Sequence, residues 1–263
     1  MTISYLITCC NEDRTLGNLL ERVYSSMDSE DEIVILDDFS GNPKTQEILS
    51  EYSKKDNVKL YQHALDRNYG AHKNYGNELC KKDFIFQLDG DECPSSTLIL
   101  NIKAIIEANP EVELFAVPRI NDFKGVTPEH AKHWGWRLSP CDQITHEKII
   151  DTNSIEYKFL KTEGYIIEES INDIASVRIK YKAVIVNAMD PQGRIYKNDP
   201  KRIRWNRRLH EKLEGYTKFT TLPLDYELSL YHDKTIEVQL QTNKRYNEWF
   251  TDEENRGHSG FTN

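Results

Sequence analysis

Long apolar runs, paired cysteines and low-complexity segments are all missing from this chain of 263 residues. No apolar stretch approaches the roughly 18 residues that a membrane-spanning helix needs, and Met1 to Tyr5 lacks the basic start of a signal peptide. The five cysteines are odd in number and show no Cys-x-x-Cys spacing, which argues against a disulfide framework and a structural zinc site. We therefore expect a cytoplasmic protein with reduced cysteines.

The composition fits an enzyme with one large core. The net charge of −9 disfavours a general coat of nucleic acid, although it says nothing about local basic patches. A chain of this length can bury a sizeable core as one domain. We predict a single domain over residues 1–250, with halves that meet near residue 120, and a flexible tail over 251–263.

The first half alternates between short apolar runs and segments with helical spacing. Repeated βα units of this length predict an α/β protein with a doubly wound, Rossmann-like sheet, whose ligand site lies at the carboxyl ends of the strands. Residues 121–161 show too little periodicity to assign and are expected to form loops. The strand-like runs are Ile3 to Thr8, Ile33 to Leu36, Val58 to Tyr61, Phe84 to Leu88 and Leu114 to Val117.

Each of the first four strand-like runs ends in polar side chains. Two carboxylates that flank a glycine, as in Asp89-Gly90-Asp91, suit a hard divalent cation that keeps positions open for a diphosphate. A single cluster of this kind could be a helix cap or a solvated turn. The four clusters are Thr8, Asn11 and Glu12; Asp37, Asp38 and Ser40; Arg67, Asn68, Gly70, Lys73 and Asn74; and Asp89, Asp91 and Glu92.

The order of these motifs resembles family 2 glycosyltransferases with the GT-A fold, over roughly the first 120 residues. A second match near the C-terminal end resembles the branch related to lipopolysaccharide-core sugar transferases. The resemblance implies a mixed sheet with a nucleotide-sugar-binding half, residues 1–120, and a C-terminal acceptor-binding half, residues 121–250. The second match consists of Arg204-Trp205-x-x-Arg208-x-His210-Glu211 and Tyr231-His232-x-Lys234-x-x-Glu237-x-Gln239.

The resemblance assigns the donor site to the strand ends. Asp38 would accept a hydrogen bond from the donor base, and one member of the Asp37-Asp38 pair would cap the helix after Pro43. Arg67 and Lys73 would face phosphate or sugar oxygens. The complete set of expected donor-binding residues is Thr8, Asn11, Glu12, Asp38, Arg67, Asn68, Gly70, Lys73 and Asp89.

The implied reaction is a metal-dependent, inverting transfer. Asp91 would bind Mn²⁺ or Mg²⁺ directly, with Asp89 on the ribose or the water shell and His232 as a late ligand, unless that histidine is structural. Glu211 is the first candidate for the general base, and its alternative is an ion pair with Arg207 or Arg208 on a helix. Weaker candidates for the base are Glu168, Glu169 and Asp173.

The acceptor side is predicted from a basic stretch with tryptophans. Such a stretch attracts a phosphorylated or acidic acceptor, and tryptophan can stack on a sugar ring, although both can also be a solvated face and core anchors. The expected acceptor-binding residues are Trp205, Arg204, Arg208, His210 and Trp136. The basic stretch contains Arg194, Lys197, Lys201, Arg202, Arg204, Arg207, Arg208 and Lys212.

Three functions follow from these patterns. The first is transfer from a nucleotide sugar, with a UDP-sugar expected, to a glycan or glycolipid, in the cytoplasm or at the inner face of a membrane. The second is sugar transfer to a hydroxylated base in DNA, as in bacteriophage enzymes that act in a host cytoplasm. The third is a nucleotide-sugar-binding module that has lost catalysis.

Overall fold

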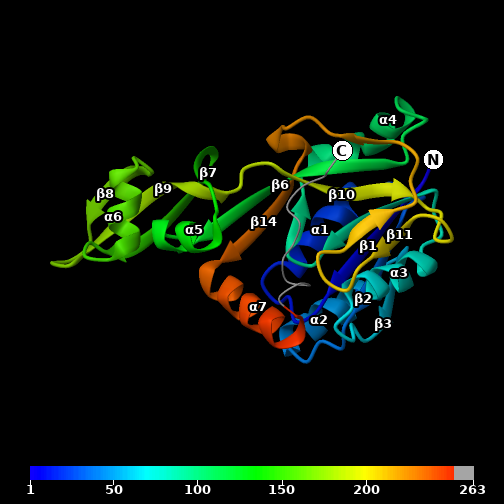
Figure 1. The fold of residues 1–263 in the computed structure, drawn as a ribbon, viewed down its shortest axis with the longest axis horizontal. Coiled ribbons are helices and arrows are strands. Elements are labelled where there is room, and N and C mark those ends of the chain that lie inside the picture. Colours follow the sequence, from blue (N-terminus) through cyan, green and yellow to red (C-terminus); the bar gives the residue numbers. More distant parts are fainter. Residues whose placement is uncertain (252–263) are drawn as a thin grey trace. The chain divides into compact units, whose positions relative to one another are not determined.

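The parallel part of the sheet follows the apolar runs predicted from the sequence. The computed structural model describes residues 1–251. Its four parallel strands lie in the order β3-β2-β1-β4 (Figure 1), so the first strand lies in the middle, as in a doubly wound sheet. They are β1 (Ile3–Cys9), β2 (Glu32–Asp37), β3 (Val58–Gln62) and β4 (Phe84–Asp89).

Helices cover both faces of these strands because the strand residues are apolar on both sides. Ile3, Tyr5 and Ile7 of β1 belong to one hydrophobic cluster, which includes side chains of three helices. Leu6 belongs to a second cluster on the other face, together with Trp205. The three helices of the first cluster are α1 (Leu16–Ser26), α2 (Pro43–Tyr52) and α4 (Ser96–Glu107). The second face carries α3 (Tyr69–Leu79), β11 (Arg204–Asn206) and β12 (Lys212–Glu214).

Side-chain caps start three of these helices at polar residues. Asn42 accepts hydrogen bonds from the backbone N–H groups of Lys44 and Thr45 at the start of α2. Asn68 and Ser95 cap α3 and α4 in the same way. The prediction that Asp37 or Asp38 caps the helix after Pro43 is therefore wrong, because the side chain of Asn42 caps that helix.

Antiparallel strands extend the sheet beyond β4 and make it mixed, as predicted. The strand order continues from β4 through β10, β6 and β14 to β5, and β13 is parallel to β6. A helix, α7, follows β14 directly. These elements are β5 (Glu92–Pro94), β6 (Leu114–Lys124), β10 (Asp190–Lys197), β13 (Phe219–Thr221), η1 (Tyr226–Leu228), β14 (Leu230–Thr235) and α7 (Ile236–Trp249).

The contacts divide the chain into two units. The first contains residues 1–118, 191–231 and 242 onwards, and the second contains 119–190 and 232–241. The break after residue 118 lies near the predicted boundary at 120, but residues 191–231 return to the first unit. The prediction of one domain over 1–250 stays a prediction.

The second unit contains regular structure where loops were expected over 121–161, so that expectation is wrong. β7 pairs with β9 over most of its length, and its inward positions include His146 and Lys148, opposite Tyr181 and Ile179. Polar residues on both sides of β7 hide the alternation that identifies a strand. The unit contains α5 (Pro128–Trp134), β7 (Leu138–Asp151), α6 (Ile155–Thr162), β8 (Ile166–Ile171) and β9 (Ser176–Val186).

Among residues 1–251, no helix combines the length and apolar character that a membrane crossing requires. The flexible tail predicted over 251–263 lies outside the described residues, apart from Thr251.

Candidate functional site

The carboxyl ends of β1 and β4 place the first site residues side by side. The parallel register pairs Thr8 with Asp89, and the Thr8 hydroxyl donates to Asp89 Oδ1 over 3.0 Å. Gln87, two residues earlier on β4, donates from Nε2 to the same oxygen over 2.9 Å. The end of β4 therefore presents a carboxylate whose orientation is fixed by two neutral donors.

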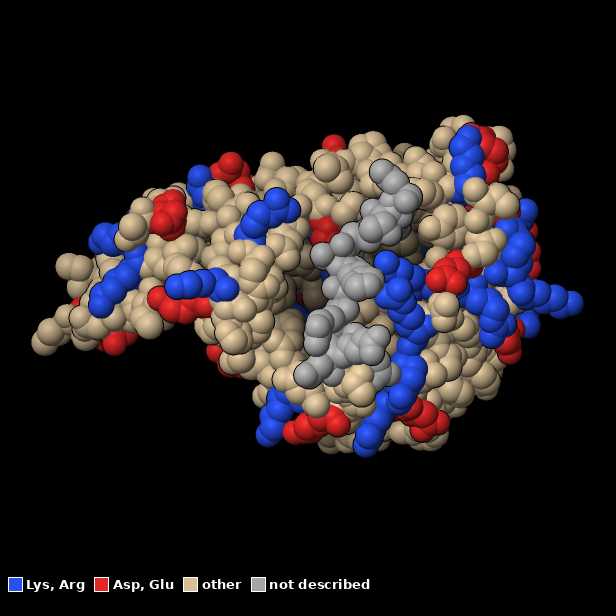
Figure 2. All heavy atoms as spheres, viewed as in Figure 1, with Lys and Arg blue, Asp and Glu red and all other residues tan. Residues whose placement is uncertain are grey.

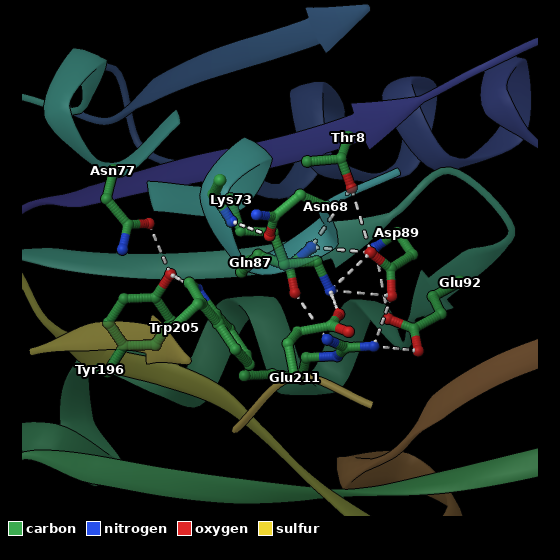
Figure 3. Close-up of polar contacts among 12 residues, drawn as sticks. Thr8, Asn68, Lys73, Asn77, Gln87, Asp89, Glu92, Tyr196, Trp205 and Glu211 are labelled. Carbon is green, nitrogen blue, oxygen red and sulfur yellow. Dashed lines mark hydrogen bonds and ion pairs between the residues drawn. The ribbon is translucent and has the colours of Figure 1, made fainter. Parts of the chain in front are cut away.

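Two buried cations also contact Asp89, namely Arg194 and Lys73, of which Figure 3 labels Lys73. Lys73 Nζ lies 3.0 Å from Oδ1, and Arg194 Nη2 lies 2.7 Å from Oδ2. Burial alone would raise the pKa of Asp89, but the positive charges of Arg194 and Lys73 hold that pKa well below its usual range. Asp89 is therefore ionised at neutral pH, and both of its oxygens are engaged.

Glu211 comes to the same place from a distant part of the chain. Its Oε1 lies 2.7 Å from Lys73 Nζ, so one ammonium contacts Asp89 and Glu211 (Figure 3). Glu211 lies in the segment between β11 and β12, which is a loop and not a helix. Glu211 forms its ion pair with Lys73, so the alternative of a pair with Arg207 or Arg208 on a helix is wrong.

Three contacts hold the loop of Glu211 against α3. The Asn74 side chain exchanges hydrogen bonds with the backbone N–H and C=O of Trp205, each over 2.8 Å. The backbone N–H of Tyr69 donates to the carbonyl of Arg208 over 2.9 Å. Gly70 permits this approach, because a Cβ there would lie 2.3 Å from the carbonyl oxygen of Arg207.

The turn after β4 requires glycine between its two aspartates. The Gly90 N–H donates to the carbonyl of Thr8 over 2.8 Å. A Cβ at Gly90 would lie 3.0 Å from Glu12 Cγ and 3.1 Å from Cys9 Cβ. The turn is thus packed tightly against β1, and it places half-buried Asp91 immediately after the strand end.

Asp38 and Asn11 organise the loops after β1 and β2. Asp38 Oδ1 accepts from the backbone N–H of Leu65 over 2.9 Å, which ties the end of β2 to the loop after β3. Asn11 Oδ1 accepts from the backbone N–H groups of Gly41 and Asn42. Three predicted donor residues therefore lie at adjacent strand ends, because Thr8 also ends β1.

Unusual backbone geometry gathers around these loops. Asn11, Phe39, Asp66 and Arg67 have positive φ angles of 59°, 46°, 47° and 55°, directly after β1, β2 and β3. Non-glycine residues adopt this region at a cost, and such residues concentrate at functional sites. Arg67 is exposed, and its guanidinium lies 5.6 Å from the ring centre of Trp249.

The predicted acceptor residues divide into a core residue and surface residues. Trp205 is 7% exposed, and its indole N–H donates to the hydroxyl of Tyr196, so it anchors the second hydrophobic cluster and does not offer a stacking face. Arg204, Arg208 and His210 are exposed on the β11–β12 region. Half-buried Trp136 belongs to the second unit, where it packs against Phe123.

The basic stretch is less positive at the surface than its composition indicates. Arg194 is 4% exposed and contacts Asp89 and Glu92, so its assignment to a surface patch is wrong. Arg202 pairs with Glu113. Figure 2 shows basic side chains with acidic ones among them around the position of β11 in Figure 1. The members that remain exposed include Lys197, Lys201, Arg204, Arg207 and Arg208.

His232 belongs to the second unit, in β14. The ring is 7% exposed, and its Nδ1 lies 2.9 Å from Asn121 Oδ1. The contact joins His232 to β6, which carries Asn121. The assignment of His232 as a metal ligand stays a prediction.

The weaker candidates for the base have other contacts in the second unit. Glu169 accepts a hydrogen bond from the Tyr157 hydroxyl and pairs with Lys161. Asp173 accepts from the backbone N–H groups of Ala175 and Ser176 in the turn between β8 and β9. Both contacts are those of surface and turn carboxylates.

The residues that could hold a divalent cation are carboxylates at the end of β4. Within residues 1–251 no three His, Cys, Asp or Glu side chains are grouped as a metal site. Asp89 is saturated by four side chains. Asp91 is a half-buried carboxylate, and carboxylate oxygens are ligands of the kind that Mg²⁺ and Mn²⁺ take. The chemistry of the Asp91 carboxylate is thus compatible with a hard divalent cation.

The roles of three buried residues, Gln87, Glu92 and Arg194, were not predicted from the sequence. Gln87 accepts from Arg194 Nη1 over 2.6 Å while it donates to Asp89. Glu92 Oε1 lies 2.6 Å from Arg194 Nη2 and is 1% exposed. The role of Gln87 could have been predicted from the sequence, because a polar residue inside an otherwise apolar strand needs hydrogen-bond partners.

Comparisons with known proteins agree with this fold. Glycosyl transferase family 2 matches residues 4–162. The crystal structure of S. aureus TarS 1–349 superposes with a TM-score of 0.51 at 15% identity, over 89% of this chain and 60% of that one. Its complex with UDP-GlcNAc gives 0.49 at 17% identity, over 89% and 59%.

A third structure is less similar. The mannosyltransferase PcManGT from Pyrobaculum calidifontis, in complex with GDP-Man and Mn²⁺, gives a TM-score of 0.38 at 17% identity, over 44% of this chain and 34% of that one. No curated protein matches the sequence. The chain thus spans about 60% of the length of the TarS 1–349 structure.

Proposed function

The chain belongs to glycosyl transferase family 2 and has the GT-A fold, and from that membership we propose that it transfers a sugar from a nucleotide-sugar donor to an acceptor hydroxyl with inversion. The observation that carries the proposal is the convergence of Glu211 and Asp89 on Lys73, next to Asp91. A candidate base and the candidate cation ligand thereby share one site at the carboxyl ends of the parallel strands.

The donor nucleotide is proposed to bind across the ends of β1 and β2. Asp38 would accept from the N–H edge of the base, with Thr8 and Glu12 beside it, and its bond from the Leu65 N–H orients the carboxylate. Exposed Arg67 would meet phosphate oxygens, and Asn68 and Gly70 would shape the start of α3 next to them. A UDP-sugar is the proposed donor.

Mn²⁺ or Mg²⁺ is proposed to bind at Asp91, where it would neutralise charge on the leaving diphosphate. Asp89 would act indirectly, as a support for the site, because its oxygens already accept hydrogen bonds from Thr8 and Gln87 and contact two cations. The role of His232 as a further ligand stays a prediction made from the sequence. The residues of this chain thus supply one direct carboxylate and a rigid support for it.

Glu211 is proposed to be the general base. The acceptor oxygen would attack the anomeric carbon as the bond to the diphosphate breaks, and the acceptor proton would pass to Glu211. A single displacement of this kind inverts the anomeric configuration. A positioned carboxylate typically contributes about 10²- to 10⁴-fold to such a step.

The proposed acceptor is a glycan or glycolipid. Arg204, Arg208 and His210 lie exposed beside the loop of Glu211, where they would contact acidic or phosphorylated groups. The role of Trp136, in the second unit, stays a prediction made from the sequence. Trp205 is omitted from this set because it is buried. Exposed Lys197, Lys201 and Arg207 keep hydroxylated DNA as the second candidate.

The test is calorimetric titration with a panel of nucleotide sugars, with and without Mn²⁺, followed by nucleotide release for each binder. Metal-dependent binding and turnover of one nucleotide sugar is the expected result. Binding without turnover on glycan or DNA acceptors would favour the non-catalytic module. If no nucleotide sugar binds in the presence of metal, the assignments of Asp38, Asp89 and Asp91 fail together.

A further inference from the structure

We propose that Lys73 is a positioning residue that acts through Glu211, and is not a contact to the donor phosphates. This inference rests on the proposed function in one respect, namely that Glu211 is the general base. It changes the role expected from the sequence, in which Lys73 faces phosphate or sugar oxygens. It predicts that removal of the ammonium slows the chemical step and leaves donor binding unchanged.

The ammonium of Lys73 is enclosed by groups of the protein. The residue is 2% exposed. Its Nζ lies 2.7 Å from Glu211 Oε1, 3.0 Å from Asp89 Oδ1 and 4.9 Å from the ring centre of Trp205. Two carboxylates and an aromatic face therefore surround an ammonium that has three N–H groups to donate. A donor phosphate would have to displace one of these partners.

The charge of Lys73 is secured by the same contacts. Burial would lower the pKa of the ammonium, but Asp89 and Glu211 together raise it above its ordinary value. A second buried cation, Arg194, contacts Asp89 from the other side and pairs with Glu92. Because Arg194 also holds Asp89, loss of Lys73 should release Glu211 more than it releases Asp89.

Glu211 needs a side-chain anchor because its loop is strained. Arg207 and His210, which precede it, have positive φ angles of 73° and 52°. Contacts of Trp205 and Arg208 with α3 fix the start of this loop, and the pairing of Lys212 with Asn206 fixes its end. The side chain of Glu211 is in turn oriented by its ion pair with Lys73. A base displaced by about 1 Å can lose about 100-fold in rate.

A double-mutant cycle with Lys73→Met and Glu211→Gln tests this coupling. We expect Lys73→Met to lower kcat about 100-fold, with the donor KM and the calorimetric donor affinity unchanged. The double variant should be no slower than Glu211→Gln alone, because a residue that acts only through Glu211 has nothing left to position. Lys73→Gln, which keeps an N–H donor, should recover part of the loss.

Two results would overturn the inference. One is a multiplicative loss of kcat in the double variant. The other is a weaker donor affinity in Lys73→Met, which would return Lys73 to the donor site. If Lys73→Met does not fold, as judged by its thermal unfolding, the same cycle is run with Lys73→Gln. Full activity of Glu211→Gln would instead contradict the proposed base, so the two failures are distinguishable.

The chain offers a matched control in Lys59. This lysine pairs with buried Glu32 at the amino-terminal ends of β2 and β3, over 2.8 Å. Lys59→Met removes the same charge from a lysine–glutamate pair in the same sheet. Its kcat should stay within about twofold of the wild type, since it has no contact with the site; a loss as large as that of Lys73→Met would assign the effect to general destabilisation.

Discussion

The two ends of the parallel strands both contain buried carboxylates paired with lysine, yet they are built differently. At the amino-terminal end, Glu32 Oε1 accepts from the Ser4 hydroxyl over 2.8 Å and from the backbone N–H of Lys81 over 2.6 Å, and Oε2 accepts from Lys59. Glu32 there has its own partners, and Lys103, which bridges buried Asp31 and exposed Asp28 at the same end, is itself 20% exposed. At the carboxyl end, Lys73 is shared between two carboxylates, and Arg194 is shared between two.

The difference separates structural charges from charges that suit chemistry. A carboxylate with its own set of donors mainly fixes the strands around it. Shared cations keep Asp89, Glu92 and Glu211 close together, although like charges repel. The backbone is also strained around this end, at Asn11 and Arg67 among others. Concentrated charge with local strain is the pattern of an active site.

Removal of Asp91 gives the largest expected difference between the two ends. Asp91→Ala should lower turnover about 10³-fold or more, because the cation that stabilises the leaving group loses its carboxylate. Asp83→Ala is the matched control at the other end of β4, where Asp83 accepts from the N–H and hydroxyl of Thr2. Steady-state kinetics with Mn²⁺ checks both; an active and folded Asp91→Ala would remove the metal assignment.

Trp205→Phe tests whether this tryptophan belongs to the core or to the acceptor site. The change removes the hydrogen bond from the indole to Tyr196, whose hydroxyl in turn donates to Asn77. We expect a loss of about 1–2 kcal/mol in the free energy of unfolding, with the KM for the acceptor nearly unchanged. Urea denaturation and acceptor kinetics check this, and a raised KM at unchanged stability would restore a stacking role.

Lys59→Met should have the smallest effect, and only on stability. The lysine is half exposed, so we expect a loss of about 1 kcal/mol at neutral pH. Burial would raise the pKa of Glu32, but the bonds from Lys59, Lys81 and Ser4 lower it below its ordinary value of 4.5. The stability that Glu32 contributes is thus present above pH 4.5 and is lost as the pH falls below it.

Urea unfolding of wild type and Lys59→Met at several pH values measures this linkage. The difference between the two proteins in the free energy of unfolding, here the stability gap, should be constant above pH 5. It should narrow as Glu32 becomes protonated in both proteins. A gap that widens on acidification would mean that Glu32 is not held in its ionised form by Lys59.

The sequence predicted those parts of the site that are local in the chain. Asp89, Gly90 and Asp91 follow an apolar run, so their place at a strand end could be read from the pattern. The pairing of Lys73 with Glu211 could not, because 138 residues separate the two. Arg194 was assigned to a basic surface because a charge count carries no information about burial. Strand β7 was missed because polar residues, among them His146 and Lys148, occupy its inward positions.

The role of Glu211 as general base is tested most directly by the turnover of Glu211→Gln with its donor and Mn²⁺, together with the calorimetric donor affinity of this variant. The variant keeps the shape and a hydrogen-bonding oxygen but cannot take a proton at neutral pH. If Glu211 is the base, kcat should fall about 10²- to 10⁴-fold while the donor affinity stays unchanged. A kcat close to that of the wild type would contradict the claim that Lys73 and Asp89 mark the catalytic centre.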